Sequence, residues 1–351
     1  MKEKATQPAN RRPVTMKQVA ELAGVHASTV SRALNPATRS VVVPDLVARV
    51  MKAANKLGYR LDPVAASLRT GRSKLVGILV PQIATSVFTP ILAGATERLA
   101  AHGYFSIIGY LDTDTEAQLE FAHGLIARRV DGLILATATR HDPLASFCIE
   151  RGVPTVLVNR AEDEARLSAV VSDELLGAQL AVDHLVELKH VKIGHIAGPE
   201  DNSTGFLRRK GFVQALASHG LDGNRAPCEV AASYTREDGL EAMRRLLSAH
   251  PEVTAVVAAN DSLALGVYDA LREKGLPCPR YMSVVGHNDM PLVDMVEPPL
   301  TTIRISHEEM GRQVADLLQQ AIEVREQPVR KVVLPPKLIV RGSTAAPRKG
   351  K

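Results

Sequence analysis

Four clusters of polar residues lie between residues 159 and 289, and each directly follows an apolar segment of the length of a buried strand. The clusters are Asn159-Arg160, Gly198–Thr204 with Arg208, Asn260-Asp261 and His287-Asn288-Asp289. Because ligands of open α/β sheets bind beyond the carboxyl ends of the strands, we expect these clusters to converge in one cleft. A single member such as Asp261 can equally cap the helix that follows it.

Motifs of catalysis are absent from the sequence. The chain has no H-E-x-x-H, phosphate-loop or G-x-S-x-G motif, and none of its three cysteines has a nearby partner that would activate it. His184, His190 and His195 span a helix end, a loop and a strand, a spacing unsuited to tetrahedral zinc. We therefore expect a binding protein without enzymatic activity, catalytic residues, cofactor or metal.

A second set of residues with functional spacing lies near the N-terminus. Thr15 and Gln18 form a capping box at the start of a predicted helix, and Gly24 fits the left-handed residue after its end. A second short helix follows over residues 27–34. Its outward positions hold small or basic residues, namely Ala27, Ser28, Ser31 and Arg32. This helix-turn-helix pattern, with little bulk on its outer face, suits insertion into the major groove of DNA.

The distribution of charge supports a DNA-binding head. Residues 1–74 contain 14 basic and four acidic residues, whereas the remainder has a net charge of −5. A basic segment of this size fits a polyanion, and such binding weakens steeply with salt. Aromatic residues make up only 3% of the chain, which disfavours base-stacking platforms. With no apolar run of membrane-spanning length and no secretory signal, we expect a cytoplasmic protein.

The elements that position these residues can be read from apolar periodicity. Pro44 opens a third helix that extends to about Leu57, although Val43 offers it no side-chain cap. From Lys74 onward, apolar strands alternate with helices, which indicates parallel sheets covered on both faces. The alternation suffices for two sheets of five or six strands each. The predicted fold is thus a small all-α helix-turn-helix head plus an α/β two-lobed body of parallel sheets.

Two stretches of sequence resemble one known family. VTMKQVAELAGVHASTVSRALN (Val14–Asn35) is similar to the DNA-binding signature of the lactose-repressor (LacI) family, and LGYRLDPVAASLRTGRS (Leu57–Ser73) is similar to its hinge. The resemblance continues to about Ser343. It implies a body like that of periplasmic binding proteins, in which the chain crosses between the lobes near residues 173, 305 and 335.

The resemblance also implies a set of domain boundaries. They are a disordered basic tail over 1–13, the helix-turn-helix domain over 14–60, a hinge helix and linker over 61–74, a first lobe over 75–173 with 306–335, a second lobe over 174–305 with 336–343, and a short tail over 344–351. The hinge helix is too short to be stable alone, so we expect it to order only when dimer and DNA are both present.

Residues of the DNA site carry over from the family position by position. Ala27, Ser28 and Arg32 match base-reading positions, with a thymine methyl as the expected partner of Ala27, unless Ala27 is only a helix spacer. Thr29, Ser31 and Asn35 match phosphate contacts, and Thr15 and Met16 at the start of the first helix complete the set in the head. Leu68, beside Val64 and Ala65, matches the leucine wedged into the minor groove, unless it only packs two hinge helices together.

The predicted effector residues are Phe88, Asn159, Arg160, Thr204, Arg208, Tyr234, Asn260 and Asn288. In the family, Phe88 and Tyr234 match aromatic walls and Arg208 matches a clamp on the effector. Asn159 and Asn288 stand where members that bind neutral sugars often carry aspartates, and Arg160 adds a positive charge. We therefore expect an anionic effector such as a sugar acid, a sugar phosphate or a small organic acid, unless Asp173 and Asp289 point inward and offset the change.

These observations predict a sequence-specific DNA-binding transcription regulator, as a homodimer on a near-palindromic operator. A small molecule in the cleft would switch its operator affinity, and repression is the expected mode. The alternative is a solute-binding protein of the same body fold without a DNA role, which the basic head and the missing signal sequence disfavour.

Overall fold

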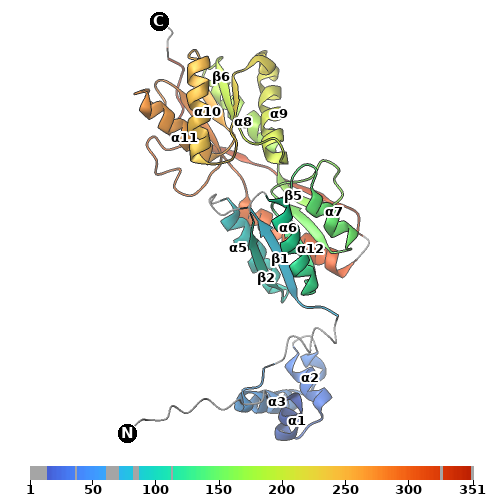
Figure 1. Ribbon diagram of the computed structural model, residues 1–351. Coiled ribbons are helices and arrows are strands. Elements are labelled where there is room, and N and C mark those ends of the chain that lie inside the picture. The colour runs from blue at the N-terminus through green and yellow to red at the C-terminus, as the bar shows by residue number, and fades with distance from the viewer. Residues whose placement is uncertain are drawn as a thin grey trace, which may run out of the picture. The chain divides into compact units, whose positions relative to one another are not determined.

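The computed structural model describes residues 14–35, 38–60, 71–81, 87–111, 114–324 and 327–348. The chain divides into two compact units, with the boundary between Ser73 and Lys74. We call the first unit the head and the second the body (Figure 1).

The described helices of the head are α1 (Met16–Ala23), α2 (Ala27–Leu34), the 3-10 turn η1 (Arg39–Val41) and α3 (Pro44–Leu57). The capping box at Thr15 is confirmed, because the Thr15 hydroxyl accepts the Gln18 N–H and the Gln18 side chain accepts the Thr15 N–H. Gly24 takes the left-handed conformation with φ 62°. The core consists of small apolar side chains, with Val19, Val30 and Val50, one from each helix, fully buried.

The body contains two six-stranded sheets, as the alternation of strands and helices predicts. The first has the order β11 (Lys331–Leu334), β5 (Ser168–Ser172), β4 (Thr155–Val158), β3 (Gly132–Leu135), β1 (Leu75–Val80), β2 (Phe105–Tyr110). The second has the order β12 (Lys337–Ile339), β10 (Thr301–Arg304), β9 (Ser283–Asn288), β8 (Ala255–Ala258), β6 (Ile193–Ala197), β7 (Cys228–Val230). All neighbouring strands are parallel except β10 and β12.

Helices cover both faces of each sheet, and each sheet with its helices forms one lobe (Figure 1). The first lobe holds α5 (Phe88–Ala101), α6 (Thr115–Ala127), α7 (Pro143–Glu150) and α12 (His307–Glu323). The second lobe holds α8 (Glu174–Glu187), α9 (Ser203–Ser218), the turn η2 (Gly223–Arg225), α10 (Arg236–Ala249) and α11 (Asp261–Glu273).

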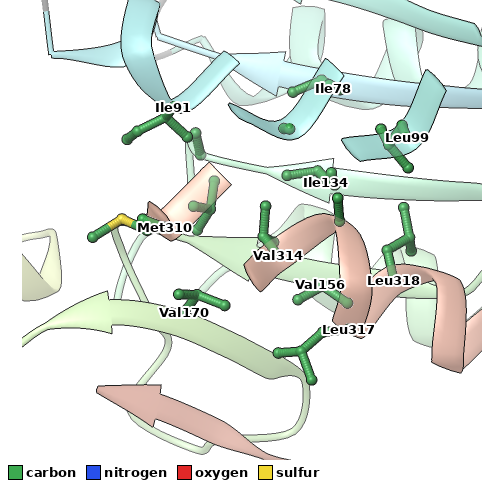
Figure 2. Close-up of a cluster of buried hydrophobic side chains, with 14 of the residues drawn as sticks. Ile78, Ile91, Leu99, Ile134, Val156, Val170, Met310, Val314, Leu317 and Leu318 are labelled. Atoms are coloured by element: carbon green, nitrogen blue, oxygen red, sulfur yellow. The ribbon is translucent and has the colours of Figure 1, made fainter. Parts of the chain in front are cut away.

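One core cluster shows how distant segments complete the first lobe. Side chains of α5, such as Ile91 and Leu99, meet Val314 and Leu318 of α12 over the apolar face of the first sheet (Figure 2). Strand β11 then pairs in parallel with β5, and the next strand, β12, pairs with β10 of the other sheet. The C-terminal part of the chain therefore contributes to both lobes.

The structure adds strands that apolar periodicity did not indicate. β5, β10, β11 and β12 are three to five residues long. Segments this short show little periodicity, and pairing with a neighbouring strand decides their conformation. The C-terminal segment is also more than a tail, because Ala345 and Arg348 are hydrogen-bonded to the second lobe. Among the described helices, none has the length and apolar character needed to span a bilayer.

Candidate functional site

The predicted recognition helix is α2, which carries five of the eleven predicted DNA-binding residues, and a sixth, Asn35, is its C-cap. Ser28 and Arg32 are exposed, whereas Ala27, Thr29, Ser31 and Asn35 are half-buried. Ala27 packs against the core of the head, so its side chain is less free than the outward position in the helix suggests. Arg39 donates to the carbonyl of Ala33 at 3.0 Å and so stabilises the C-terminal end of α2.

Other predicted DNA-binding residues lie at the start of α1 or outside the described part of the chain. The exposed Thr15 holds the capping box, and the half-buried Met16 packs against the core of the head. The predicted hinge residues Val64, Ala65 and Leu68 lie outside the described residues. The expected roles of all of these residues at DNA stay predictions.

All eight predicted effector residues line one cavity of about 380 Å³ in the body. Both lobes contribute to it, with Phe88, Asn159 and Arg160 from the first and Thr204, Tyr234 and others from the second. The sequence clusters converge here because β4, β6, β8 and β9 are members of parallel sheets whose carboxyl ends face the same space. A cavity of this size is within the range of small-molecule sites.

The two lobes contact each other beside this cavity. The Arg140 N–H donates to the Asp201 carbonyl at 2.8 Å, and the Ala161 N–H donates to Ser203 Oγ at 3.0 Å. The Arg140 guanidinium also lies 3.7 Å from the centre of the Phe206 ring. These contacts join the loops after β3 and β4 to the start of α9.

Arg208 reaches the cavity from α9, but most of its donors are occupied by the protein. Its Nε and Nη2 donate to Glu174 at 2.6 and 3.1 Å, Nη1 donates to the Ala259 carbonyl, and Nη2 donates to Asn288 Oδ1. An arginine has five N–H groups, so only one remains for a ligand. The geometry leaves no bidentate fork of Arg208 free toward the cavity.

The charge of Arg208 is also compensated. Glu174 is buried, which by itself raises the pKa of this carboxyl, but the charge of Arg208 and the neighbouring His287 outweigh burial and hold the pKa at about 2. His287 Nε2 lies 3.2 Å from the Glu174 carboxylate. Because burial and the charge of Arg208 lower the pKa of His287 to about 4, the imidazole is neutral at pH 7. Glu174 therefore supplies the counter-charge to Arg208.

Arg160, in contrast, forms no ion pair within the described part of the chain, and the nearby charges of Tyr234 and Asp201 offset the effect of burial on it only in part. Its Nε is buried without a hydrogen bond, and burial lowers the pKa of its guanidinium. Two more cavity residues of the first lobe have buried polar atoms without partners, Thr137 Oγ1 and Asn159 Oδ1. Buried polar groups are normally hydrogen-bonded, so these three atoms lack the partners that such groups usually have.

The second-lobe side of the cavity is internally bonded. Asn202 caps α9 and accepts from the hydroxyl of Thr204, which lies 3.2 Å from the hydroxyl of Tyr234. Asn260 caps α11 through its bond from the Leu263 N–H at 2.7 Å. The helix-cap alternative thus applies to Asn260 rather than to Asp261.

Asp173 and Asp289, the two aspartates whose charge could offset that of Arg160, bond to other groups of the protein. Asp173 caps α8 by accepting the Leu176 N–H. Asp289 pairs with Arg304 and Arg341 at 2.6 and 2.7 Å. The cavity wall instead contains Asp142, which caps α7, and Asp201.

Sequence reasoning missed several residues of the cavity and its support. These are Thr115, Gln118, Thr137, Thr139 and Asp142 on the wall, and Glu174 behind Arg208. Thr137 and Thr139 follow β3, so the same rule on strand ends would have found them. Glu174 gives no such signal, because it lies in the first turn of α8 and resembles a favourable helix start.

The histidine series is structural. His190 contacts the hydroxyls of Thr254 and Ser283, and His195 lies 2.7 Å from the Val257 carbonyl and stacks on Phe212. In the described part of the chain, no group of histidine, cysteine and acidic residues has an arrangement that could hold a metal ion.

Comparison with known proteins gives one family match for the head and one for the body. Residues 15–62 match the family described as bacterial regulatory proteins, lacI family, and residues 182–344 match a periplasmic binding protein-like domain. The ribose operon repressor of Escherichia coli (strain K12) is 32% identical over 334 residues, which cover 94% of this chain and 99% of that protein.

Solved structures give the same result. The lac repressor dimer bound to operator and the anti-inducer ONPF matches with a TM-score of 0.84 and 29% identity, over 95% of this chain and 100% of that chain. The complex of the transcriptional regulator CelR with cellobiose matches with a TM-score of 0.72 and 31% identity, with the same coverage.

Proposed function

Because the chain belongs to the lacI family of bacterial regulatory proteins and is a DNA-binding transcriptional repressor with an effector-binding domain, we propose how its two units carry out repression. The head binds a near-palindromic operator as part of a homodimer. The cavity of the body binds a small hydroxylated effector that carries an acidic group. Binding of one ligand changes the affinity for the other.

The DNA-binding part of the proposal is supported by α2. Its exposed face presents Ser28 and Arg32, and an arginine that points into the major groove reads guanine through two hydrogen bonds. Two such helices in a homodimer fit half-sites about one turn of DNA apart. The similar lac repressor was solved as a dimer on its operator. A solute-binding protein without a DNA role does not account for this head.

Replacement of Arg32 tests this part. We expect Arg32→Ala to weaken binding to a selected operator by roughly 1–3 kcal/mol and to relax the preference at one base pair, while binding to random DNA changes little. Fluorescence anisotropy on the operator and its single-base variants measures both effects. Arg225→Ala is the matched control, because Arg225 is exposed in the body and its one ion pair among the described residues is with Asp222. Equal affinity of the Arg32 variant for all sites would remove this role.

The effector part of the proposal rests on one observation: Arg160, Thr137 and Asn159 line the same cavity, and each has a polar side-chain atom without a hydrogen-bond partner. The site offers a charged donor, a hydroxyl and an acceptor on one wall, which suits an acidic group next to hydroxyl groups. Arg208, neutralised by Glu174, has one N–H left for a ligand oxygen. The anionic class therefore depends on Arg160 rather than on the Arg160–Arg208 pair.

A thermal-shift series with paired probes tests the effector class. D-gluconate is compared with D-glucose, and ribose 5-phosphate with ribose, with cellobiose as a larger neutral sugar. A ligand at a hundred times its dissociation constant adds about 2.7 kcal/mol, which raises the melting temperature by several degrees. We expect a response to an acid or a phosphate that Arg160→Met abolishes and that Arg236→Met, an exposed control outside the cavity, leaves unchanged. A response to neutral sugars alone, unaffected by Arg160→Met, contradicts the anionic class.

A further inference from the structure

The N-terminal cap of the predicted recognition helix α2 is a histidine, and its ring contacts Ser28, which is expected to read DNA. His26 is the N-cap of α2 with φ −74° and ψ 150°. Its Nδ1 accepts the backbone N–H of Ser28 at 3.3 Å and lies 2.8 Å from Ser28 Oγ. Serine, threonine, aspartate and asparagine are the usual residues at such a position.

The contact with the backbone N–H indicates which atom donates each proton. A backbone N–H can only donate, so Nδ1 must carry a lone pair and the ring proton must be on Nε2. The Ser28 hydroxyl, at 2.8 Å from the same Nδ1, can then bond to it only by donating its single hydrogen. The lone pairs of Ser28 Oγ remain, and among the described residues no other group donates to this exposed side chain.

We propose that His26 is a specificity-determining residue, because it presents Ser28 to DNA as a hydrogen-bond acceptor only. An acceptor in the major groove pairs with the amino groups of adenine or cytosine and not with the O6 and N7 of guanine or the O4 of thymine. A serine hydroxyl without this bond can both donate and accept, so it can pair with the amino groups of adenine or cytosine and also with the acceptors of guanine or thymine. His26 thus restricts the base that Ser28 reads to adenine or cytosine. This inference rests on the proposed insertion of α2 into the major groove.

The test compares five full-length proteins on DNA selected from a pool of random duplexes by the wild type. They are the wild type, His26→Ala, His26→Asn, Ser28→Ala and the double variant of His26→Ala with Ser28→Ala. Ser28→Ala identifies the base pair that Ser28 reads, because only that preference disappears. One neutral hydrogen bond corresponds to a preference of roughly 2- to 10-fold, measured by anisotropy on single-base variants of the selected duplex.

We expect the wild type to prefer adenine or cytosine at that position. In His26→Ala the freed hydroxyl also donates, so the preference falls below about twofold while the preference read by Arg32 is kept. His26→Asn restores most of the preference, since its Oδ1 accepts from the same N–H and hydroxyl groups. In a Ser28→Ala background, His26→Ala has no further effect on base preference.

Three results overturn the inference. One is a preference of the wild type for guanine or thymine at the base pair that Ser28 reads. This result can be obtained even if His26→Ala fails to fold. Another is an equal loss of affinity for every duplex in His26→Ala, because His26 would then act only as a cap. A wild type that selects no sequence at all overturns the proposed DNA function itself, and this inference with it.

Discussion

At the scale of single residues, the type of a side chain is a weaker guide to its role than its partners. Arg160 and Arg208 line the same cavity, yet Glu174 compensates only Arg208. Truncation of one partner in a buried ion pair leaves the other charge uncompensated, which makes such pairs costly to disturb. Arg208 is thus fixed by the protein, whereas Arg160 has a donor to offer. In the same way, the carboxylate of Asp289 is bound to two arginines and does not act as a carboxylate that faces the ligand.

Asp261, at the start of α11, leads to a pH prediction. Burial raises its pKa to about 7, although bonds from Thr302 and the Met290 N–H act in the other direction. Because the pKa of Asp261 is higher in the folded state than in the unfolded state, the protonated carboxyl stabilises the fold. This stabilisation is complete below the pKa of the unfolded state, near 4, and is lost as the pH rises through about 7. In Asp261→Asn the neutral amide replaces the protonated carboxyl, so this variant does not lose stability at this position as the pH rises.

We therefore expect the free energy of unfolding of the wild type, relative to Asp261→Asn, to fall between pH 4 and 7 and to level off above. The slope is at most about 1.4 kcal/mol per pH unit. Urea denaturation at several pH values measures it. Asp269→Asn is the control, because the bond from Arg236 lowers the pKa of Asp269 and places its effect below pH 4. A difference between wild type and Asp261→Asn that does not change with pH contradicts the assignment.

At the scale of elements, close packing of α5 on α12 holds the first lobe together. A Cβ added at Gly94 of α5 would lie 2.2 Å from the Glu308 carbonyl, and one at Gly311 of α12 would lie 2.1 Å from the Ile91 carbonyl. Both obstacles are backbone atoms, so the helices would have to separate. Small residues on the facing sides therefore set the distance between two helices that are far apart in sequence.

Gly94→Ala tests this packing. Alanine favours a helix over glycine, but here we expect a loss of about 1–3 kcal/mol in the free energy of unfolding, because the added methyl overpacks the interface. Gly124→Ala in α6 is the control, since its Cβ would meet only the flexible end of Arg128 at 3.4 Å. That variant should gain about 0.5–1 kcal/mol. Equal effects of the two variants in urea denaturation would contradict the account.

At the scale of the whole molecule, the body is a two-lobed structure whose cavity lies between parts that contact directly. The bonds from Arg140 to Asp201 and from Ala161 to Ser203 cross between the lobes next to Arg160. A ligand that favours one arrangement of the lobes shifts their equilibrium only by its difference in affinity for the two arrangements. Repression controlled by an effector requires that operator binding favours one of them as well.

Reciprocity gives a prediction at this scale. If the effector found by thermal shift changes the dissociation constant for operator by some factor, operator must change the constant for effector by the same factor. Coupling of 1–3 kcal/mol corresponds to about 5- to 150-fold. Operator titrations with and without effector, and effector titrations with and without operator, measure the two factors. If both factors equal one, the ligand is not the effector of repression.

Local patterns in the sequence determined much of this protein. The capping box at Thr15, the left-handed Gly24 and the helix opened by Pro44 depend on neighbours in the chain, so they could be read directly. The alternation of strands and helices determined two parallel sheets, and the polar clusters after strands were predictable because parallel strands end at one edge.

Only the tertiary structure decided which charges cancel and which remain free. Glu174 and Arg208 are 34 residues apart in sequence and become a buried pair through the packing of α8 on α9. The unpaired atoms of Arg160, Asn159 and Thr137 are likewise a property of the assembled cavity. The short strands β11 and β12 take their places by pairing with residues far away in the chain. Periodicity reports the environment of one segment, whereas these features depend on which segments meet.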